Sequence, residues 1–278
     1  MTAGRGRVWL VGAGPGDPGL LTRKAAALLR SADLVLYDAL VPPAIVALAR
    51  HAQRFSVGKR AGRPSFRQET IHLLMIRAAR RGRKVVRLKA GDPFVLGRGG
   101  EEALALRAAG VPFEVVPGVS SALAAPALAG IPVTHRGLSA GFMVVSGHAA
   151  SSYRPLLEML PPESVTLVVL MGLAEAPAIA SLLIGTGWRA ATPVAVVFAA
   201  GTPEAATWLG SLATIGSCRD EAPGGAPATI VIGQVAALGG VIGRTGVPEL
   251  KVGRRTGVPD LKVGPTEMGR QESHVSHR

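Results

Sequence analysis

Short apolar runs alternate with amphipathic segments along most of the chain. Runs 34–37 and 85–88 are rich in branched apolar residues and lie just ahead of charged residues or glycine, as buried strands do. Segment 66–81 instead carries Ile71 and Met75 at helical spacing. Strands that alternate with helices build parallel α/β sheets, so the pattern predicts an α/β protein.

Two such series are separated by a short break. Strands are expected at 8–11, 34–37, 55–57, 85–88, 113–116, 142–145, 165–171, 193–198 and 228–232, and helices at 20–30, after Pro42, and at 66–81, 101–109, 122–128, 152–160, 175–184 and 212–218. The stretch 131–136 reads Ile-Pro-Val-Thr-His-Arg and resembles a linker. We therefore expect two α/β domains, at residues 1–135 and 136–240.

The character of the sequence changes from residue 241. Residues 244–253 are nearly repeated at 255–264, and both copies contain glycine and proline. Two copies are too few to stack as a solenoid, and a polar end follows. We expect a disordered basic tail at 241–278.

The apolar segment 165–185 is about as long as a membrane-spanning helix. Its first residues are β-branched, however, and Gly172 interrupts it. Glu175 and Pro177 are typical of the first turn of a helix. We interpret the segment as a strand followed by a helix and expect no membrane partner.

The composition narrows the classes of function. Hydrophobic residues make up 48% of the 278 residues, which is a globular composition. Cys218 is the single cysteine, so no internal disulfide can form and a reducing, cytoplasmic setting is expected. The six histidines are scattered rather than placed at metal-ligand spacing, so no metal site is expected.

The net charge of +13 indicates an anionic partner, which leaves nucleic acid, a membrane surface or a polyacidic metabolite as alternatives. Much of the positive charge falls between residues 60 and 89. Aromatic residues at 4% leave little for base stacking, and no helix-turn-helix or RNA-binding signature is present. A basic nucleic-acid-binding protein is therefore the alternative from a different class, and no nucleic-acid partner is expected.

Three charged residues follow three predicted strands. Asp38 and Lys59 each stand near a strand end, and Asp92 lies between Gly91 and Pro93 at the end of another. The carboxyl ends of parallel strands meet at one edge, where open α/β sheets bind ligands. A turn in which Asp92 caps its own backbone, with the other two charges solvated, is the alternative.

A glycine-rich turn follows the first strand. Residues 12–17 read Gly-Ala-Gly-Pro-Gly-Asp, whereas the dinucleotide fingerprint requires Gly-x-Gly-x-x-Gly. Pro15 also removes one of the amides that would face a pyrophosphate, so we discount a nicotinamide dinucleotide. Ser120 and Ser121 follow the fifth strand, where they can cap a helix or bind a ligand; capping is the commoner use.

Taken together, the motifs form an ordered set. They lie at residues 11–22, 37–38, 58–60, 87–94, 97–102, 116–118 and 130–136. The set resembles the uroporphyrinogen-III C-methyltransferases of the tetrapyrrole methylase superfamily over about residues 7–240. We expect the methylase portion alone, without the dehydrogenase/ferrochelatase domain of the fused sirohaem synthases. The resemblance implies two α/β domains of that type, S-adenosylmethionine in the cleft between them, and a homodimer.

The resemblance also implies a reaction. It is the C-methylation of uroporphyrinogen III at C2 and C7 to precorrin-2, which uses two molecules of S-adenosylmethionine and feeds sirohaem or cobalamin synthesis. The alternative is another member of the superfamily that acts on a later corrinoid precursor. A reduced tetrapyrrole with eight carboxylates suits a basic rim.

Site residues carry over position by position. Asp38 is implied as the general base and Lys59 as the general acid, and Arg60, Arg98 and Arg136 as ligands of substrate carboxylates. The implied cofactor-binding residues are Pro15, Ala90, Gly91, Asp92, Val95, Ser120, Ser121, Met171 and Gly201. Ala90 stands where the family commonly has glycine, and Ser120–Ser121 where it commonly has Thr-Ala.

Overall fold

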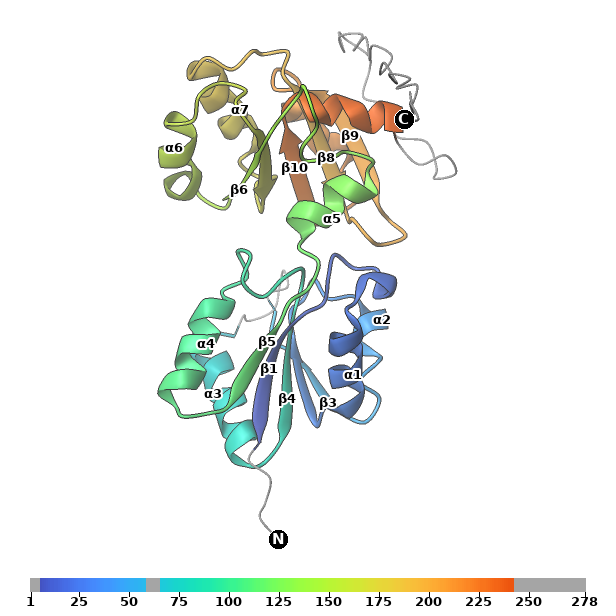
Figure 1. Ribbon diagram of the computed structural model, residues 1–278, viewed down its shortest axis with the longest axis vertical. Helices are drawn as coiled ribbons and strands as arrows, with labels where there is room; N and C mark the ends of the chain where they lie inside the picture. The colour runs from blue at the N-terminus through green and yellow to red at the C-terminus, as the bar shows by residue number, and fades with distance from the viewer. Residues whose placement is uncertain (1–5, 59–65, 243–278) are drawn as a thin grey trace, which may run out of the picture.

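The chain folds into two lobes, each built on a five-stranded sheet (Figure 1). The structure, a computed structural model, describes residues 6–58 and 66–242. The strands are β1 (Arg7–Gly12), β2 (Leu34–Tyr37), β3 (Gln53–Ser56), β4 (Lys84–Lys89), β5 (Phe113–Val116), β6 (Phe142–Ser146), β7 (Thr166–Leu170), β8 (Pro193–Phe198), β9 (Ala206–Ser211) and β10 (Ala228–Ile232). The α-helices are α1 (Arg23–Ser31), α2 (Pro43–Val46), α3 (Gln68–Arg80), α4 (Gly99–Ala108), α5 (Ser121–Leu128), α6 (Ala150–Glu158), α7 (Ala176–Gly185) and α8 (Gly239–Ile242). Three 3-10 helices are η1 (Pro18–Leu20), η2 (Ile215–Glu221) and η3 (Gln234–Leu238).

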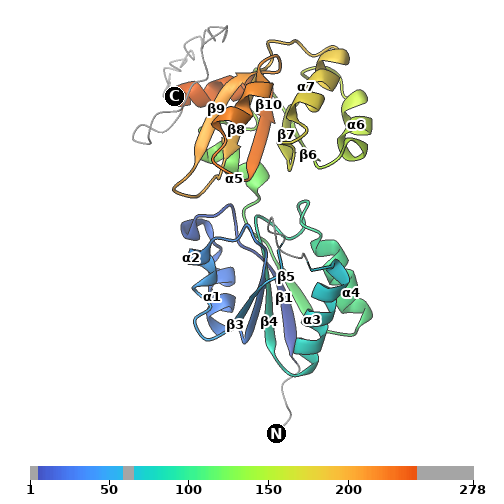
Figure 2. The same ribbon diagram turned by 180° about the vertical axis from the view of Figure 1, so that it is seen from behind.

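The N-terminal lobe (residues 6–117) contains a fully parallel sheet in the order β3-β2-β4-β1-β5. Helices α1 and α2 cover one face and α3 and α4 the other (Figures 1 and 2). Each face has its own core, with Val86 and Leu88 on the first and Val85 on the second. Because the strands are parallel, all their carboxyl ends point toward the other lobe.

The C-terminal lobe (residues 118–242) contains a mixed sheet in the order β6-β7-β10-β8-β9. Strands β6 and β7 pair in parallel, and the other pairs are antiparallel. Helices α6 and α7 pack on one face. The predicted α/β fold is confirmed, and four predicted strands (34–37, 113–116, 193–198 and 228–232) agree with the structure at both ends.

Two local predictions in this lobe are wrong. The sequence pattern missed β9, an edge strand that contains Gly210. Gly210 is required there because a Cβ atom would lie 2.3 Å from the Trp208 ring, which folds over it. The predicted helix at 212–218 is instead η2, a 3-10 helix that begins at Ile215.

Helix α5 lies against the second sheet, where it contacts β7 and β10. Ile131 is buried in the same layer, beside Val231 and Val235. The chain therefore passes from one sheet to the other between β5 and α5, ahead of the boundary at 135/136 expected from the sequence. The connection 117–120 joins the lobes in Figure 1.

The apolar segment 165–185 is β7 followed by α7, as expected from Gly172 and Pro177. Among the described residues, no helix is long and apolar enough to cross a bilayer. Lys59, Arg60 and the predicted tail at 241–278, except its first two residues, lie outside the described residues.

Candidate active site

Three loops meet at the carboxyl ends of β1, β4 and β5. Gly14 and Gly91 form an antiparallel bridge, with N–O distances of 2.8 and 3.1 Å. A Cβ atom on Gly118 would lie 2.4 Å from the Gly91 carbonyl oxygen and 2.7 Å from the Cα atom of Gly12. Glycine at these positions lets three backbones touch, so the rim exposes main chain rather than side chains.

The Asp92 side chain stabilises this arrangement of loops with two hydrogen bonds. Its Oδ1 accepts a hydrogen bond from the Phe94 amide at 2.8 Å, and its Oδ2 accepts one from the Gly118 amide at 3.1 Å. The first bond is the local turn expected as an alternative. The second joins the loop after β4 to the loop after β5, so Asp92 holds two of the predicted cofactor segments together.

Ser120 caps α5, because its Oγ accepts from the Ala122 amide at 3.3 Å. Ser121 lies beside Gly91, because a Cβ atom added to Gly91 would be 3.6 Å from the Ser121 hydroxyl oxygen. The left-handed backbone falls on Gly91, with φ of +66°, whereas Ala90 has an ordinary conformation. The alanine methyl group therefore fits this position without backbone strain.

The C-terminal lobe contributes the opposite rim. Met171 and Ala199, which follow β7 and β8, have left-handed backbones with φ of 58° and 44°. Such strain in non-glycine residues clusters at functional sites. A Cβ atom on Gly201 would lie 3.2 Å from the Pro15 ring and 3.1 Å from the Asp17 amide nitrogen. Predicted cofactor residues from the two lobes thus come into contact.

The chemistry of these segments fits S-adenosylmethionine. The cofactor loops, defined as residues 12–18, 90–95, 118–121 and 199–202, contain no lysine or arginine. They carry Asp17 and Asp92. Val95, within these loops, is 37% exposed, and Met171, which follows β7, is 51% exposed. A pyrophosphate would need positive charge here, whereas a sulfonium cation with an adenosine group needs apolar surface and close backbone approach.

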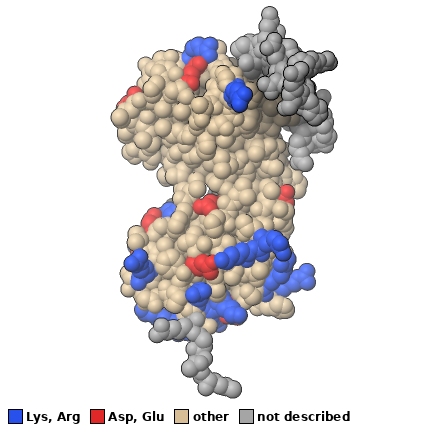
Figure 3. Space-filling model, viewed as in Figure 1, with Lys and Arg blue, Asp and Glu red and all other residues tan. Residues whose placement is uncertain are grey.

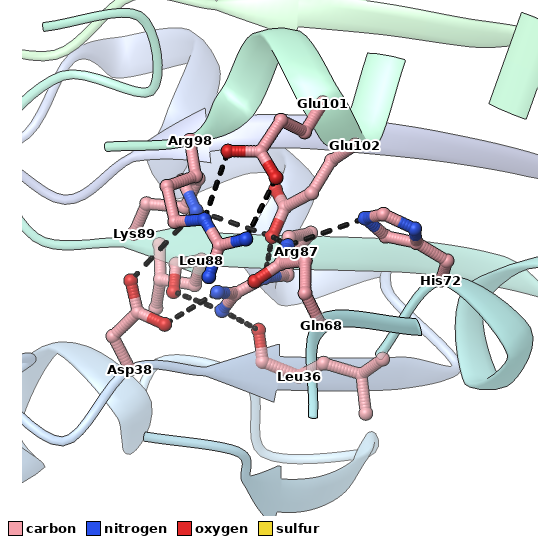
Figure 4. Close-up of polar contacts among 10 residues, drawn as sticks. All are labelled: Leu36, Asp38, Gln68, His72, Arg87, Leu88, Lys89, Arg98, Glu101 and Glu102. Carbon is pink, nitrogen blue, oxygen red and sulfur yellow. Dashed lines mark hydrogen bonds and ion pairs between the residues drawn. The ribbon is translucent and has the colours of Figure 1, made fainter. Parts of the chain in front are cut away.

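Asp38 belongs to a group of buried charges. The β4 ion cluster, defined as Asp38, Arg87, Lys89 and Glu102, lies between β2, β4 and α4 (Figure 4). Arg87 Nη2 lies 2.5 Å from Asp38 Oδ1, and Arg87 Nε lies 2.9 Å from Glu102 Oε1. Lys89 Nζ lies 3.2 Å from Glu102 Oε1 and 4.0 Å from Asp38 Oδ2.

The environment shifts the pKa values of the two buried cations, Arg87 and Lys89, in opposite directions. Burial lowers the pKa of Lys89, and the neighbouring Arg87 charge lowers it further. For Arg87, burial also favours the neutral form, but the carboxylates of Asp38 and Glu102 outweigh it and raise the pKa of Arg87. The cluster has two positive and two negative groups and is neutral as a unit.

Sequence reasoning identified Asp38 and missed this cluster. Arg87 and Lys89 belong to the basic stretch 60–89 of the sequence, yet each is at most 3% exposed and is paired with carboxylates. Glu102 is fully buried and was not considered. The available signal was the spacing: two cations two residues apart on a buried strand face the same side and require carboxylate partners.

The predicted substrate-binding arginines lie in different surroundings. Arg98 has φ of 57° and forms a two-pronged ion pair with Glu101, at 2.8 and 2.7 Å. That pairing raises the pKa of Arg98 and lowers the pKa of Glu101. Arg136 is exposed in the turn that the His135–Ser139 bridge closes. Arg60 lies outside the described residues.

Elsewhere in the described residues we find no second group of candidate site residues. No cluster of three or more metal-ligating side chains occurs within residues 6–58 and 66–242. A shallow concavity lined by Arg30, Leu48, Arg50 and His51 lies at the amino-terminal edge of the first sheet. No predicted site residue lines this concavity.

Comparison with known proteins points in the same direction as the geometry. The model of the tetrapyrrole (corrin/porphyrin) methylases matches residues 7–216. The sirohaem synthase of Azotobacter vinelandii is 46% identical over 236 residues, which are 84% of this chain and 51% of that protein. That of Tolumonas auensis is 46% identical over 84% of this chain and 50% of its own length. The chain spans about half the length of the curated relatives it matches.

Solved structures are similar over nearly their whole length. Uroporphyrin-III C-methyltransferase from Thermus thermophilus has a TM-score of 0.74 and 42% identity, over 87% of this chain and 100% of that one. Its complex with S-adenosyl homocysteine has a TM-score of 0.70 and 44% identity, over 83% and 98%. A cobalt precorrin-4 methyltransferase has a TM-score of 0.74 and 28% identity, over 83% and 95%.

Proposed function

This chain belongs to the tetrapyrrole (corrin/porphyrin) methylase family, and we propose that it methylates uroporphyrinogen III at C2 and C7 to give precorrin-2. The reaction uses two molecules of S-adenosylmethionine for each product and no metal, and it feeds sirohaem or cobalamin synthesis. One observation carries the proposal: cation-free cofactor loops from both lobes are in contact, and one of these loops follows β4, whose buried cations hold the Asp38 carboxylate in place.

The cofactor lies between the lobes in this proposal. The residues that hold it are Pro15, Ala90, Gly91, Asp92, Val95, Ser120, Ser121, Met171 and Gly201. When bound, S-adenosylmethionine supplies an electrophilic methyl group. The glycine backbones allow close approach, and the exposed Val95 and Met171 side chains provide apolar surface for it. Exclusion of water by these side chains favours the transfer.

The substrate lies mainly against the N-terminal lobe. Uroporphyrinogen III carries eight carboxylates, and Arg60 and Arg98 of this lobe and Arg136 of the C-terminal lobe bind some of them. Lys and Arg side chains gather on this lobe in Figure 3, and the described residues there include sixteen of them against eight Asp and Glu. The loop after β4 also exposes Phe94 and Leu96, which suit the apolar face of a macrocycle.

Asp38 acts on the pyrrole under attack. Its side chain is 29% exposed, whereas the other members of the β4 ion cluster are buried. As the pyrrole carbon gains a methyl group the ring becomes positively charged, so a fixed carboxylate stabilises it and accepts the proton that the ring then loses. Lys59 is the general acid of the same proposal.

The biological setting completes the proposal. We place the protein in the reducing cytoplasm as a homodimer, without a nucleic-acid or membrane partner. The single cysteine of the sequence, Cys218, is buried, which suits a compartment without disulfides.

A later corrinoid precursor is the second candidate substrate. The similarity to the cobalt precorrin-4 methyltransferase, at 28% identity, favours it. The higher identity to the uroporphyrin-III enzyme, at 42–44%, favours the first candidate.

Anaerobic incubation of the purified protein with S-adenosylmethionine and uroporphyrinogen III tests the proposal, with product mass as the readout. We expect two added methyl groups. Asp92→Ala, incubated in parallel, should give no product. An unmethylated substrate with S-adenosyl homocysteine still bound by calorimetry would contradict the proposal and favour the later precursor.

A further inference from the structure

One face of β4 changes from apolar to cationic along the strand. Val85, Arg87 and Lys89 alternate with residues of the opposite core and point toward α3 and α4. The two cations lie at the carboxyl end of the strand, beside the cofactor loops. Two adjacent buried cations destabilise a protein strongly unless carboxylates pair with them.

Glu102 provides that pairing from α4. Its Oε1 accepts hydrogen bonds from Arg87 Nε at 2.9 Å, from Lys89 Nζ at 3.2 Å and from Gln68 Nε2 at 3.1 Å. The carboxylate is fully buried and lies in the first turn of α4, where the helix dipole favours negative charge. Within the described chain its Oε2 has no hydrogen-bond partner, so all its polar contacts pass through Oε1.

Arg87 transmits the position of Glu102 to Asp38. Its Nε binds Glu102 and its Nη2 binds Asp38, while Nη1 donates to the carbonyl groups of Leu36 and Leu88 at 3.4 and 3.3 Å. Every guanidinium nitrogen is therefore engaged, and the planar group has one orientation. Of the four charged groups only Asp38 is exposed.

We propose that Glu102 and Lys89 are positioning residues of the methyl-transfer site. Glu102 holds Arg87 and Lys89 in place through Oε1, and these two cations hold the Asp38 carboxylate in one orientation. Neither residue touches the substrate, since both are buried. The inference rests on the proposed function, because Asp38 is the group through which they act.

Stability alone does not account for the cluster. Apolar side chains of similar volume stabilise a core as well as a buried ion pair does, and often better. The β4 ion cluster occurs where the strand reaches the cofactor loops, whereas the same face is apolar at Val85. Its location is explained by a carboxylate that must be held in one orientation.

The test compares Glu102→Gln and Lys89→Met with the unchanged full-length chain. Both variants should lower kcat/KM for uroporphyrinogen III about tenfold or more, because small misplacements of a reacting group have such effects. The dissociation constant for S-adenosyl homocysteine, measured by calorimetry, should stay within about twofold, since neither side chain is among the proposed cofactor-binding residues. Glu158→Gln, which alters an exposed Glu ion-paired with Arg154 on α6, is the matched control and should change neither value.

A double variant separates positioning from structure. Asp38→Asn/Lys89→Met keeps the buried charge balanced, with Arg87 and Glu102 still paired. It should be no slower than Asp38→Asn alone, because Lys89 acts through Asp38. Losses that multiply, or a Lys89→Met variant with unchanged kcat and KM, would overturn the inference even if Glu102→Gln fails to fold. If the unchanged chain itself transfers no methyl group, the proposed function fails and the inference with it.

Discussion

At the residue scale, the Asp92 carboxylate accepts hydrogen bonds from two loops that follow different strands. The loops after β4 and β5 supply six of the nine proposed cofactor positions. Both loops are shaped by glycine, so they have little side-chain packing of their own. The Asp92 carboxylate therefore joins the two loops that carry most of the proposed cofactor positions.

Replacement of Asp92 tests this dependence. Asp92→Ala leaves the amides of Phe94 and Gly118 without their acceptor, and should lower the free energy of unfolding by about 2 kcal/mol. It should also abolish binding of S-adenosylmethionine, as measured by calorimetry. Asp92→Asn retains one acceptor oxygen and should give an intermediate affinity. Unchanged affinity in the alanine variant would remove Asp92 from the site.

Sequence reasoning could propose the candidate site residues whose signal is local. Asp38 and Asp92 follow strands directly, and glycine beside Asp92 marks a turn. Glu102 could not be found in this way, because its role depends on packing of α4 against β4. Arg98 looked like a free cation, and only the folded loop brings it against Glu101.

At the scale of elements, the Glu163 carboxylate accepts hydrogen bonds from two other segments of the C-terminal lobe. Glu163, in the turn before β7, binds Arg189 at 2.9 and 2.6 Å and Thr192 at 2.6 Å, in the turn between α7 and β8. Gln234 of η3 approaches the same carboxylate at 3.4 Å. Hydrogen bonds from Arg189, with a further one from Thr192, lower the pKa of Glu163 to about 2.

The lowered pKa of Glu163 makes the free energy of unfolding depend on pH. Because the folded pKa of Glu163 lies below its unfolded value of about 4.3, the stabilisation is complete above that value and is lost as pH falls toward 2. The free energy of unfolding, measured by urea titration between pH 6 and 2.5, should fall less steeply in Glu163→Gln than in the parent. Parallel curves for the two proteins would exclude Glu163 as a contributor.

The three glycine-shaped loops give a second prediction for elements. Gly118→Ala places a Cβ atom 2.4 Å from the Gly91 carbonyl oxygen, so it should destabilise the protein by about 2 kcal/mol and weaken cofactor binding. Gly185→Ala, at the end of α7, meets no atom within 4 Å. It should leave binding unchanged and stabilise the fold by up to about 1 kcal/mol in thermal unfolding. Equal effects of the two changes would refute the close-contact argument.

Element prediction succeeded where burial is regular. The fully buried strand β8 is a continuous apolar run, and the largely buried strand β10 is apolar except for Thr229. Strand β9 escaped because Gly210 and its edge position hide the alternation, and the contact between Gly210 and Trp208 is a tertiary one. Helix α5 was recognised, but which sheet it covers depends on packing that no local pattern records.

For the whole molecule, charge divides between the lobes. The described part of the C-terminal lobe has four Lys and Arg against six Asp and Glu, whereas the N-terminal lobe has a twofold excess of cations. The proposed anionic substrate should therefore be attracted mainly to the N-terminal lobe, whereas the cofactor loops of both lobes contain no lysine or arginine.

Ionic strength should affect the binding of the substrate and of the cofactor product differently. Raising the ionic strength from about 0.05 to 0.5 M shortens the range of electrostatic attraction and should raise KM for uroporphyrinogen III several-fold. The dissociation constant for S-adenosyl homocysteine should change little, because its loops carry no lysine or arginine. Steady-state kinetics and calorimetry in the same buffers measure both. An equal response of both ligands would contradict this division of charge.

The described residues of the N-terminal lobe all precede those of the C-terminal lobe in the sequence, and the chain crosses between the lobes once, between β5 and α5. A single genetic crossover near the codon for residue 118 would therefore exchange an entire lobe between two related genes. The joined halves would need to match where 12–18 and 90–92 meet 118–121 and 199–202, segments in which main-chain atoms make many of the contacts. Main-chain surfaces tolerate sequence divergence, so two lobes with different sequence histories could still form this contact.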